Sequence, residues 1–227
     1  MKATRALAVC ALVGDTVLSA VLYASLPQRV PVHWNIVGNV DRYGSKLELV
    51  LLGPVLVASI WALMLLLSRI DPRRAEPVAA TPGEAQAERD GSYWTVIHLV
   101  VVTLALLHVG VLLAASGILH GPQRAVVIGL ALLLLLPGNF MGRLRPNWFV
   151  GIRTPWTLAS DDVWRRTHRL AAVLMVGGGL LLLPLALWLP APLAVAVAVA
   201  VTLAATLGPA VWSYFAWKTS GPRAHPG

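Results

Sequence analysis

Long runs of apolar residues alternate with short polar segments along the whole chain. Six of these runs reach or approach the roughly 20 residues that an α-helix needs to cross a bilayer. They cover residues 6–26, 47–67, 94–119, 125–141, 170–189 and 193–217. Within each run Leu, Val and Ala follow one another without the alternation typical of a half-buried strand. We therefore predict an all-α polytopic membrane protein with six transmembrane helices, of which the fourth is the shortest and contains Pro137.

The basic residues of the polar segments are unevenly distributed, and their distribution predicts an orientation. If the N-terminus lies inside, 14 of the 18 Lys and Arg residues fall in cytoplasmic segments and four fall in outer loops. Because cytoplasmic loops carry the excess of Lys and Arg, we expect both termini in the cytoplasm. The expected location is the bacterial cytoplasmic (inner) membrane, with the lipid bilayer as a partner, and the oligomeric state is left open.

Composition agrees with a membrane protein and excludes most soluble classes. The 227 residues are 57% hydrophobic and 12% charged, with a mean hydropathy of +0.73, whereas about a quarter of a soluble domain is charged. A secreted factor, a soluble enzyme and a nucleic-acid-binding domain are therefore excluded. In a membrane protein, the basic residues behind the net charge of +8 indicate the orientation of the chain in the bilayer. Cys10 is the single cysteine, so no intramolecular disulfide is expected.

The polar segments divide the chain into four parts. Residues 1–68 hold the first two spans and an extracytoplasmic loop at 27–46. Residues 69–93 are expected to form a flexible cytoplasmic linker, because 71–91 contains three prolines and half of the ten acidic residues. Residues 94–217 hold four spans and a cytoplasmic signature loop at 139–169, and residues 218–227 form a cytoplasmic tail.

The outer loop at 27–46 carries signals for an ordered backbone. Pro31 favours an extended conformation in the residue before it, and glycines at 38 and 44 mark two turns. We predict a short extended piece followed by two turns, the second of which feeds the next helix. The candidate contact residues of this loop are His33, Trp34, Asn35, Gly38, Asp41, Arg42, Gly44 and Lys46.

The inner segment at 139–169 combines turn residues with the start of a helix. Ser160 is a good N-cap, and the two acids after it lie in the first turn, where the helix dipole favours negative charge. This helix is expected either to lie along the cytoplasmic surface or to run straight into the fifth span. Arg153 can tie loop carbonyls together, stack on Trp156, or contact a partner or a lipid headgroup. The candidate residues are Asn139, Pro146, Asn147, Gly151, Arg153, Thr154, Pro155, Trp156, Thr157, Trp164, Thr167, His168 and Arg169.

Both segments resemble those of one known family. The pattern PVHWNxxGxxDRxGSK at 31–46 is similar to the outer loop of the SdpI-type immunity proteins. The patterns GIRTPWTL at 151–158 and THR at 167–169 are similar to the cytoplasmic signature of that family. The resemblance implies a membrane protein that protects its own cell from a secreted peptide toxin. It also implies signalling, in which toxin binding draws a small winged-helix repressor to the membrane.

Two ionisable residues lie deep inside predicted spans. Asp15 is midway along the first span, where a lone carboxylate costs roughly 2.5–3.5 kcal/mol, so a partner is expected. Counted from the cytoplasmic side, His108 of the third span reaches a similar depth, whereas His98 lies near the inner boundary. We predict an intramembrane pair of Asp15 and His108. A structural clamp, a proton- or ligand-linked role and a pocket-lining role are all open for it.

The predicted function is membrane immunity to a secreted antimicrobial peptide or toxin, with sequestration of a cytoplasmic repressor as a further role. One alternative is a small proton-linked transporter or channel-like protein that uses Asp15 and His108. Another is a structural envelope protein. The chain lacks a glycine-rich phosphate loop, an HExxH motif and a GxSxG motif, so no enzyme activity, cofactor or metal is expected, and no direct nucleic-acid binding.

Overall fold

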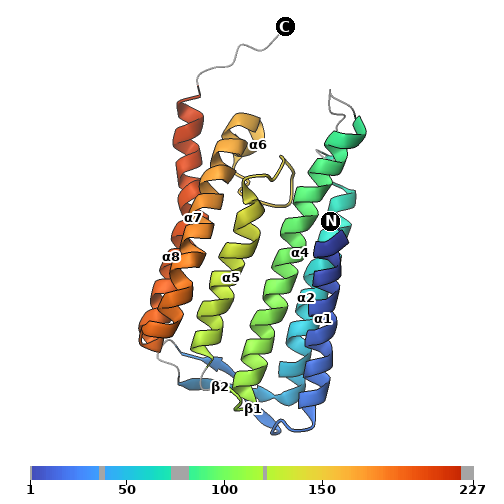
Figure 1. Ribbon diagram of the computed structural model, residues 1–227, viewed down its shortest axis with the longest axis vertical. Coiled ribbons are helices and arrows are strands. Elements are labelled where there is room, and N and C mark those ends of the chain that lie inside the picture. The colour runs from blue at the N-terminus through green and yellow to red at the C-terminus, as the bar shows by residue number, and fades with distance from the viewer. Residues whose placement is uncertain (1, 36–38, 73–81, 120–121, 221–227) are drawn as a thin grey trace.

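The computed structural model describes residues 2–35, 39–72, 82–119 and 122–220, and for residues 82–90 it describes the backbone alone. The elements in chain order are α1 (Lys2–Tyr23), β1 (Arg29–Trp34), β2 (Val40–Ser45), α2 (Lys46–Arg69), α4 (Pro82–Ala115), α5 (Gln123–Met141), α6 (Pro155–Ala159), α7 (Asp161–Trp188) and α8 (Ala191–Lys218). The long helices run side by side in one bundle (Figure 1).

Among the described residues, six helices are long and apolar enough to cross a membrane, namely α1, α2, the Gly91–Ala115 part of α4, α5, α7 and α8. The six predicted spans are therefore confirmed in number and order. Helix α7 is continuous from its first residue, so the signature helix runs into the fifth span and the surface-helix alternative is wrong. Helix α4 begins before the predicted span and extends into the expected linker 69–93. Residues 73–81 of that linker and 221–227 of the predicted tail lie outside the described residues.

The two ends of the bundle differ in structure. Strands β1 and β2 form an antiparallel hairpin at one end, and α6 with the loop before it lies at the other (Figure 1). Helix α1 begins and helix α8 ends toward the α6 end (Figure 1). We refer to these as the hairpin end and the α6 end. That the α6 end faces the cytoplasm stays a prediction from the distribution of charge.

The hairpin corrects the all-α prediction for the loop at 27–46. Its first strand lies in the predicted extended piece, but residues 40–45, expected as a turn region, form a second strand. In the observed register Arg29 lies opposite Ser45 and Trp34 lies opposite Val40, with irregular pairing between these positions. Strand pairing provides partners for backbone N–H and C=O groups that two isolated turns would leave to solvent.

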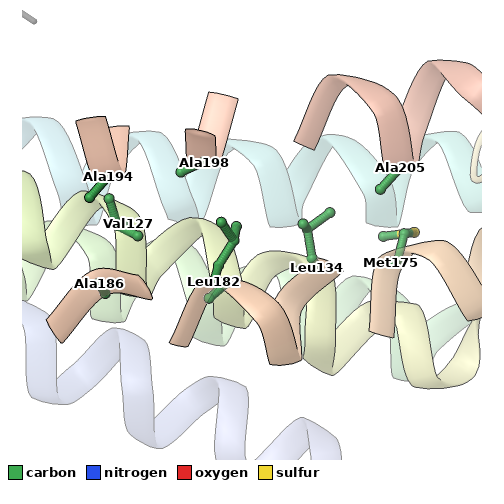
Figure 2. Close-up of a cluster of buried hydrophobic side chains, with 9 residues drawn as sticks. Val127, Leu134, Met175, Leu182, Ala186, Ala194, Ala198 and Ala205 are labelled. Atoms are coloured by element: carbon green, nitrogen blue, oxygen red, sulfur yellow. The ribbon is translucent and has the colours of Figure 1, made fainter. Parts of the chain in front are cut away.

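Helix packing divides the bundle into two halves of three helices. Helices α1 and α2 pack on α4, helices α7 and α8 pack on α5, and α4 packs on α5 where the halves meet. In the second half, alanines of α8 face larger side chains of α5 and α7 (Figure 2). The labelled residues are Val127, Leu134, Met175, Leu182, Ala186, Ala194, Ala198 and Ala205. Small residues let helix backbones approach closely, and such close packing drives helix association in lipid.

Candidate functional site

Polar side chains of the hairpin pair with one another and with the start of α2. His33 Nδ1 lies 2.5 Å from Asp41 Oδ1, and Arg42 donates a hydrogen bond of 3.1 Å to Glu48 Oε1. A Cβ at Gly44 would overlap the end of the Glu48 side chain and approach Val32 Cγ1, so a larger residue there would require these side chains to shift. These contacts fix the hairpin on α2. In the described part of the chain, no three His, Cys, Asp or Glu side chains group together as a metal site.

Two more candidate residues anchor the turn and the base of the hairpin. Asn35 Oδ1 accepts a 2.9 Å hydrogen bond from the backbone N–H of Asn39, and the Asn35 backbone N–H donates to the Asn39 carbonyl over 2.9 Å. At the base, Lys46 Nζ lies 4.4 Å from the centre of the Tyr23 ring and links the start of α2, directly after the hairpin, to α1. Gly38 lies outside the described residues.

A cavity of about 640 Å³, which we call the hairpin cavity, lies beneath the hairpin and between the two halves of the bundle. Its walls come from α2, α4, the start of α5 and one residue of α8. Three candidate residues of the outer loop, His33, Trp34 and Asn35, line it from the hairpin. His108 lines it from α4. The structure thus brings residues from the two predicted sites, the outer loop and the intramembrane pair, to one space.

Asp15 and His108 are in contact. This was predicted from their similar depths in the first and third spans. His108 Nδ1 lies 2.7 Å from Asp15 Oδ1, and both residues are buried, Asp15 being 1% and His108 8% exposed. His108 Nε2 donates over 3.0 Å to the Leu49 carbonyl. Because a carbonyl can only accept, Nε2 carries a hydrogen, and one further proton lies between Nδ1 and Oδ1. The pair is therefore neutral overall wherever that proton sits, which lowers the cost of burying it in the membrane.

Gly53 of α2 is a site residue that the sequence reasoning missed. A Cβ at position 53 would overlap the imidazole of His108, so the glycine lets this histidine lie directly against α2. Leu49, one helical turn earlier, supplies the carbonyl that accepts from the imidazole. The signal in the sequence is a single glycine within a run of Leu and Val, directly before Pro54.

At the α6 end, Asn147 organises the loop before α6. Its side chain is 3% exposed, and its Nδ2 donates to the carbonyls of Arg145 and Val150 over 3.1 and 3.0 Å. Its Oδ1 accepts from the backbone N–H groups of Phe149 and Val150 over 2.9 and 2.6 Å. A single buried amide thus satisfies four backbone groups, and the loop depends on it.

His168 of α7 is fixed between its own helix and this loop. Its Nδ1 donates to the Trp164 carbonyl over 2.9 Å, and its Nε2 accepts from the backbone N–H of Ile152 over 3.0 Å. These roles define the neutral tautomer with hydrogen on Nδ1. The Trp164 ring stacks on the imidazole at 4.1 Å, and its Nε1 donates to the Leu144 carbonyl over 2.8 Å. Gly151 has φ 105°, and a Cβ there would overlap His168 Nε2, so the position requires glycine.

Helix α6 connects the loop to α8. Thr154 and Thr157 form a capping box at its start, with Pro155 in the first turn. Trp156 Nε1 donates to Ser213 Oγ of α8 over 2.5 Å. Ser213 was not predicted, since a lone serine in an apolar helix gives no signal of a partner 57 positions away.

Arg153 and Trp148 lie on the exposed side of the loop. Arg153 Nη1 donates a hydrogen bond of 2.7 Å to the Trp148 carbonyl. Binding a carbonyl of the loop is one of the roles expected for this arginine. The Trp148 backbone N–H donates over 3.1 Å to Asp71 Oδ2 beyond the end of α2, and its side chain is 45% exposed. Among the other signature residues, Thr167 is buried, Pro146 is half-buried, and Asn139 and Arg169 are exposed.

A second cavity, of about 450 Å³, lies under residues 149–152 and is called the loop cavity below. Residues of α2 and α4 line it from one half of the bundle, and residues of α5, α7 and α8 line it from the other. The loop cavity and the hairpin cavity therefore lie along the same interface between the two halves.

Two sequence families match this chain. Residues 143–213 match the SdpI/YfhL protein family, and residues 10–58 match a domain of unknown function (DUF1648). The chain is 23% identical over 164 residues to Immunity protein SdpI of Bacillus subtilis (strain 168), which covers 72% of each chain. A comparison with solved structures gave no significant match. The first match begins in the loop organised by Asn147 and extends into α8, and the second includes the hairpin. The chain is therefore similar to SdpI-type proteins, and its described helices are long and apolar enough for a multi-pass membrane protein.

Proposed function

We propose that this protein confers immunity to a secreted, membrane-active peptide toxin, which it binds at the hairpin cavity. Similarity to Immunity protein SdpI supports this class of function. The single observation that supports this binding site is that hairpin residues and His108 line one cavity between the two halves.

The lining of the hairpin cavity matches the chemistry of a peptide that inserts into membranes. Leu52, Val111 and Val126 offer apolar walls for aliphatic or aromatic side chains. His33 and Asn35 at the hairpin place polar groups where a peptide backbone would enter. A volume of about 640 Å³ lies in the range of ordinary ligand sites, roughly 300–1,000 Å³. The cavity is therefore suited to a few side chains of such a peptide.

The interface between the halves supports a signalling role as part of this proposal. An occupant of the hairpin cavity favours the arrangement of the halves that fits it best, because a ligand shifts a conformational equilibrium by its difference in affinity. The loop over the loop cavity contacts both halves, through Asp71 beyond α2 and His168 of α7. Toxin binding then changes how Trp148 and Arg153 are presented to a cytoplasmic repressor.

Survival of a peptide-sensitive bacterium that expresses this protein tests the proposal, with Immunity protein SdpI as the positive control. Cells are challenged with membrane-active peptides from related producers, and membrane potential is recorded. Wild type is expected to preserve survival and potential, His33→Ala to reduce protection, and Arg153→Ala to keep protection while losing repressor recruitment. Failure of abundant, folded wild type against the whole panel, including the toxin that the control resists, would contradict immunity.

A proton-linked transporter is the alternative that the buried pair of Asp15 and His108 would serve. Purified protein in liposomes with an imposed pH gradient separates the two functions. The immunity account predicts that the gradient decays at the rate of empty liposomes. A faster decay that Asp15→Asn abolishes would support transport instead.

A further inference from the structure

Four arginines surround a third cavity, at the α6 end of the bundle. The cavity has a volume of about 510 Å³ and lies where the span part of α4 begins, α5 ends and α7 begins. We call it the arginine cavity. The arginines that line it are Arg143, Arg145, Arg165 and Arg169, and all four are exposed. It is separate from the hairpin cavity and the loop cavity, with which it shares no lining residue.

Positive charge exceeds negative charge among the described residues of this lining. Among the described lining residues, Asp161 carries the one carboxylate, against four arginines. Arg165 is 3.4 Å from Asp162, which also lies 3.8 Å from Arg166. Arg169 has no hydrogen bond or ion pair within the part of the chain that the structure describes. Several guanidinium groups around one space attract an anion, and their planar forks match phosphate oxygens in particular.

The arginine cavity lies where the apolar runs of three helices end, which is the level at which lipid headgroups are expected. The apolar runs of these three helices cover residues 94–119, 125–141 and 170–189, and the lining residues lie at or just beyond the ends of these runs at the α6 end. Phe140 and Leu144 add apolar surface to the same cavity. The guanidinium groups of this cavity could contact the phosphate of a phospholipid, and its apolar walls could contact the acyl chains next to that phosphate.

We propose that the arginine cavity binds the phosphate of an anionic glycerophospholipid in the leaflet at the α6 end. Basic pockets between transmembrane helices are the sites that bind such headgroups. A zwitterionic headgroup is disfavoured, because its ammonium group would be repelled by the surrounding arginines. The bound lipid contacts α4 of one half and α5 and α7 of the other, so it stabilises the contact between the halves at this end.

Native mass spectrometry of the full-length protein tests this with two lipids of identical acyl chains, phosphatidylglycerol and phosphatidylcholine. Wild type is expected to retain phosphatidylglycerol in preference and to show a higher melting temperature with it. The double variant Arg143→Gln/Arg169→Gln is expected to lose affinity by about fivefold per arginine. Arg166→Gln is the matched control, because Arg166 lies on the same helix but over the Trp212 ring of α8. It is expected to behave as wild type.

Three results would overturn the proposal. Equal retention of the two lipids by wild type would show that the headgroup charge is not recognised, and this measurement needs no variant. An equal loss per removed arginine in the double variant and in Arg166→Gln would show that the effect is one of net charge alone. Stabilisation by inorganic phosphate equal to that by phosphatidylglycerol would assign the cavity to a soluble anion. None of these results depends on the protein being an immunity protein.

Discussion

The imidazole of His108 lies 2.7 Å from the carboxylate of Asp15, although 93 positions separate the two residues in the chain. This contact ties α4 to α1, and the bond from His108 to the Leu49 carbonyl ties α4 to α2. One histidine thus joins all three helices of the first half. Because the same imidazole lines the hairpin cavity, changes around it affect both the stability of the bundle and the proposed toxin site.

Gly53→Ala tests the close approach of α2 to His108. Alanine in a helix interior is favoured over glycine by about 1 kcal/mol, but here the methyl group overlaps the imidazole, and overpacking costs about 1–3 kcal/mol. A lower melting temperature of the purified protein is therefore expected. Gly177→Ala is the matched control, because a Cβ there meets nothing within 4 Å. Equal melting temperatures for the two variants would contradict the observed packing.

Substitution of Asp15 separates a structural clamp from a proton-linked role. Asp15→Ala leaves the buried Nδ1 of His108 without its partner, and a loss of about 1–2 kcal/mol is expected in thermal unfolding. Asp15→Asn keeps a group that can donate to Nδ1, so it is expected to be close to wild type in stability. The clamp account predicts the same dependence of protection on external pH for wild type and Asp15→Asn. A pH dependence seen in wild type alone would instead support the proton-linked role.

Asn147→Ala tests whether one amide organises the loop before α6. The substitution removes four hydrogen bonds to backbone groups, and each buried group left without a partner costs about 1–3 kcal/mol. Faster hydrogen exchange across residues 142–154 and a lower melting temperature are expected. Asn139→Ala, at an exposed position, should change stability by less than about 0.5 kcal/mol. Unchanged exchange in Asn147→Ala would mean that the loop is held in another way.

The helical part of the fold was predictable, because continuous apolar runs of sufficient length have few other structures available to them in lipid. The contact of Asp15 with His108 was predictable as well, since a buried carboxylate needs a partner and depth restricts the choice. The second strand of the hairpin was missed. Gly44 suggested a turn there, but it lies in strand β2, opposite Val30 of β1.

The cavities could not be predicted from the sequence. Each one depends on how α4 and α5 set the spacing of the two halves, and the apolar periodicity of a single helix does not report that spacing. Ser213 and Gly53 were missed for the same reason, because their partners are Trp156 and His108 of other helices. The signature motif was visible in the sequence. That Asn147 and His168 hold the loop backbone in place was shown only by their hydrogen bonds in the structure.

Filling the hairpin cavity is the most direct test of the proposed toxin site. Val126→Phe adds an aromatic ring to its lining, and Val173→Phe makes the same change at a position of α7 that is 69% exposed. Both variants are compared with wild type at matched abundance and melting temperature in the peptide-challenge assay. The account predicts that Val126→Phe lowers the tolerated peptide concentration by about tenfold or more, equivalent to 1.4 kcal/mol of binding, and that Val173→Phe protects like wild type. Full protection by Val126→Phe would contradict binding at the hairpin cavity.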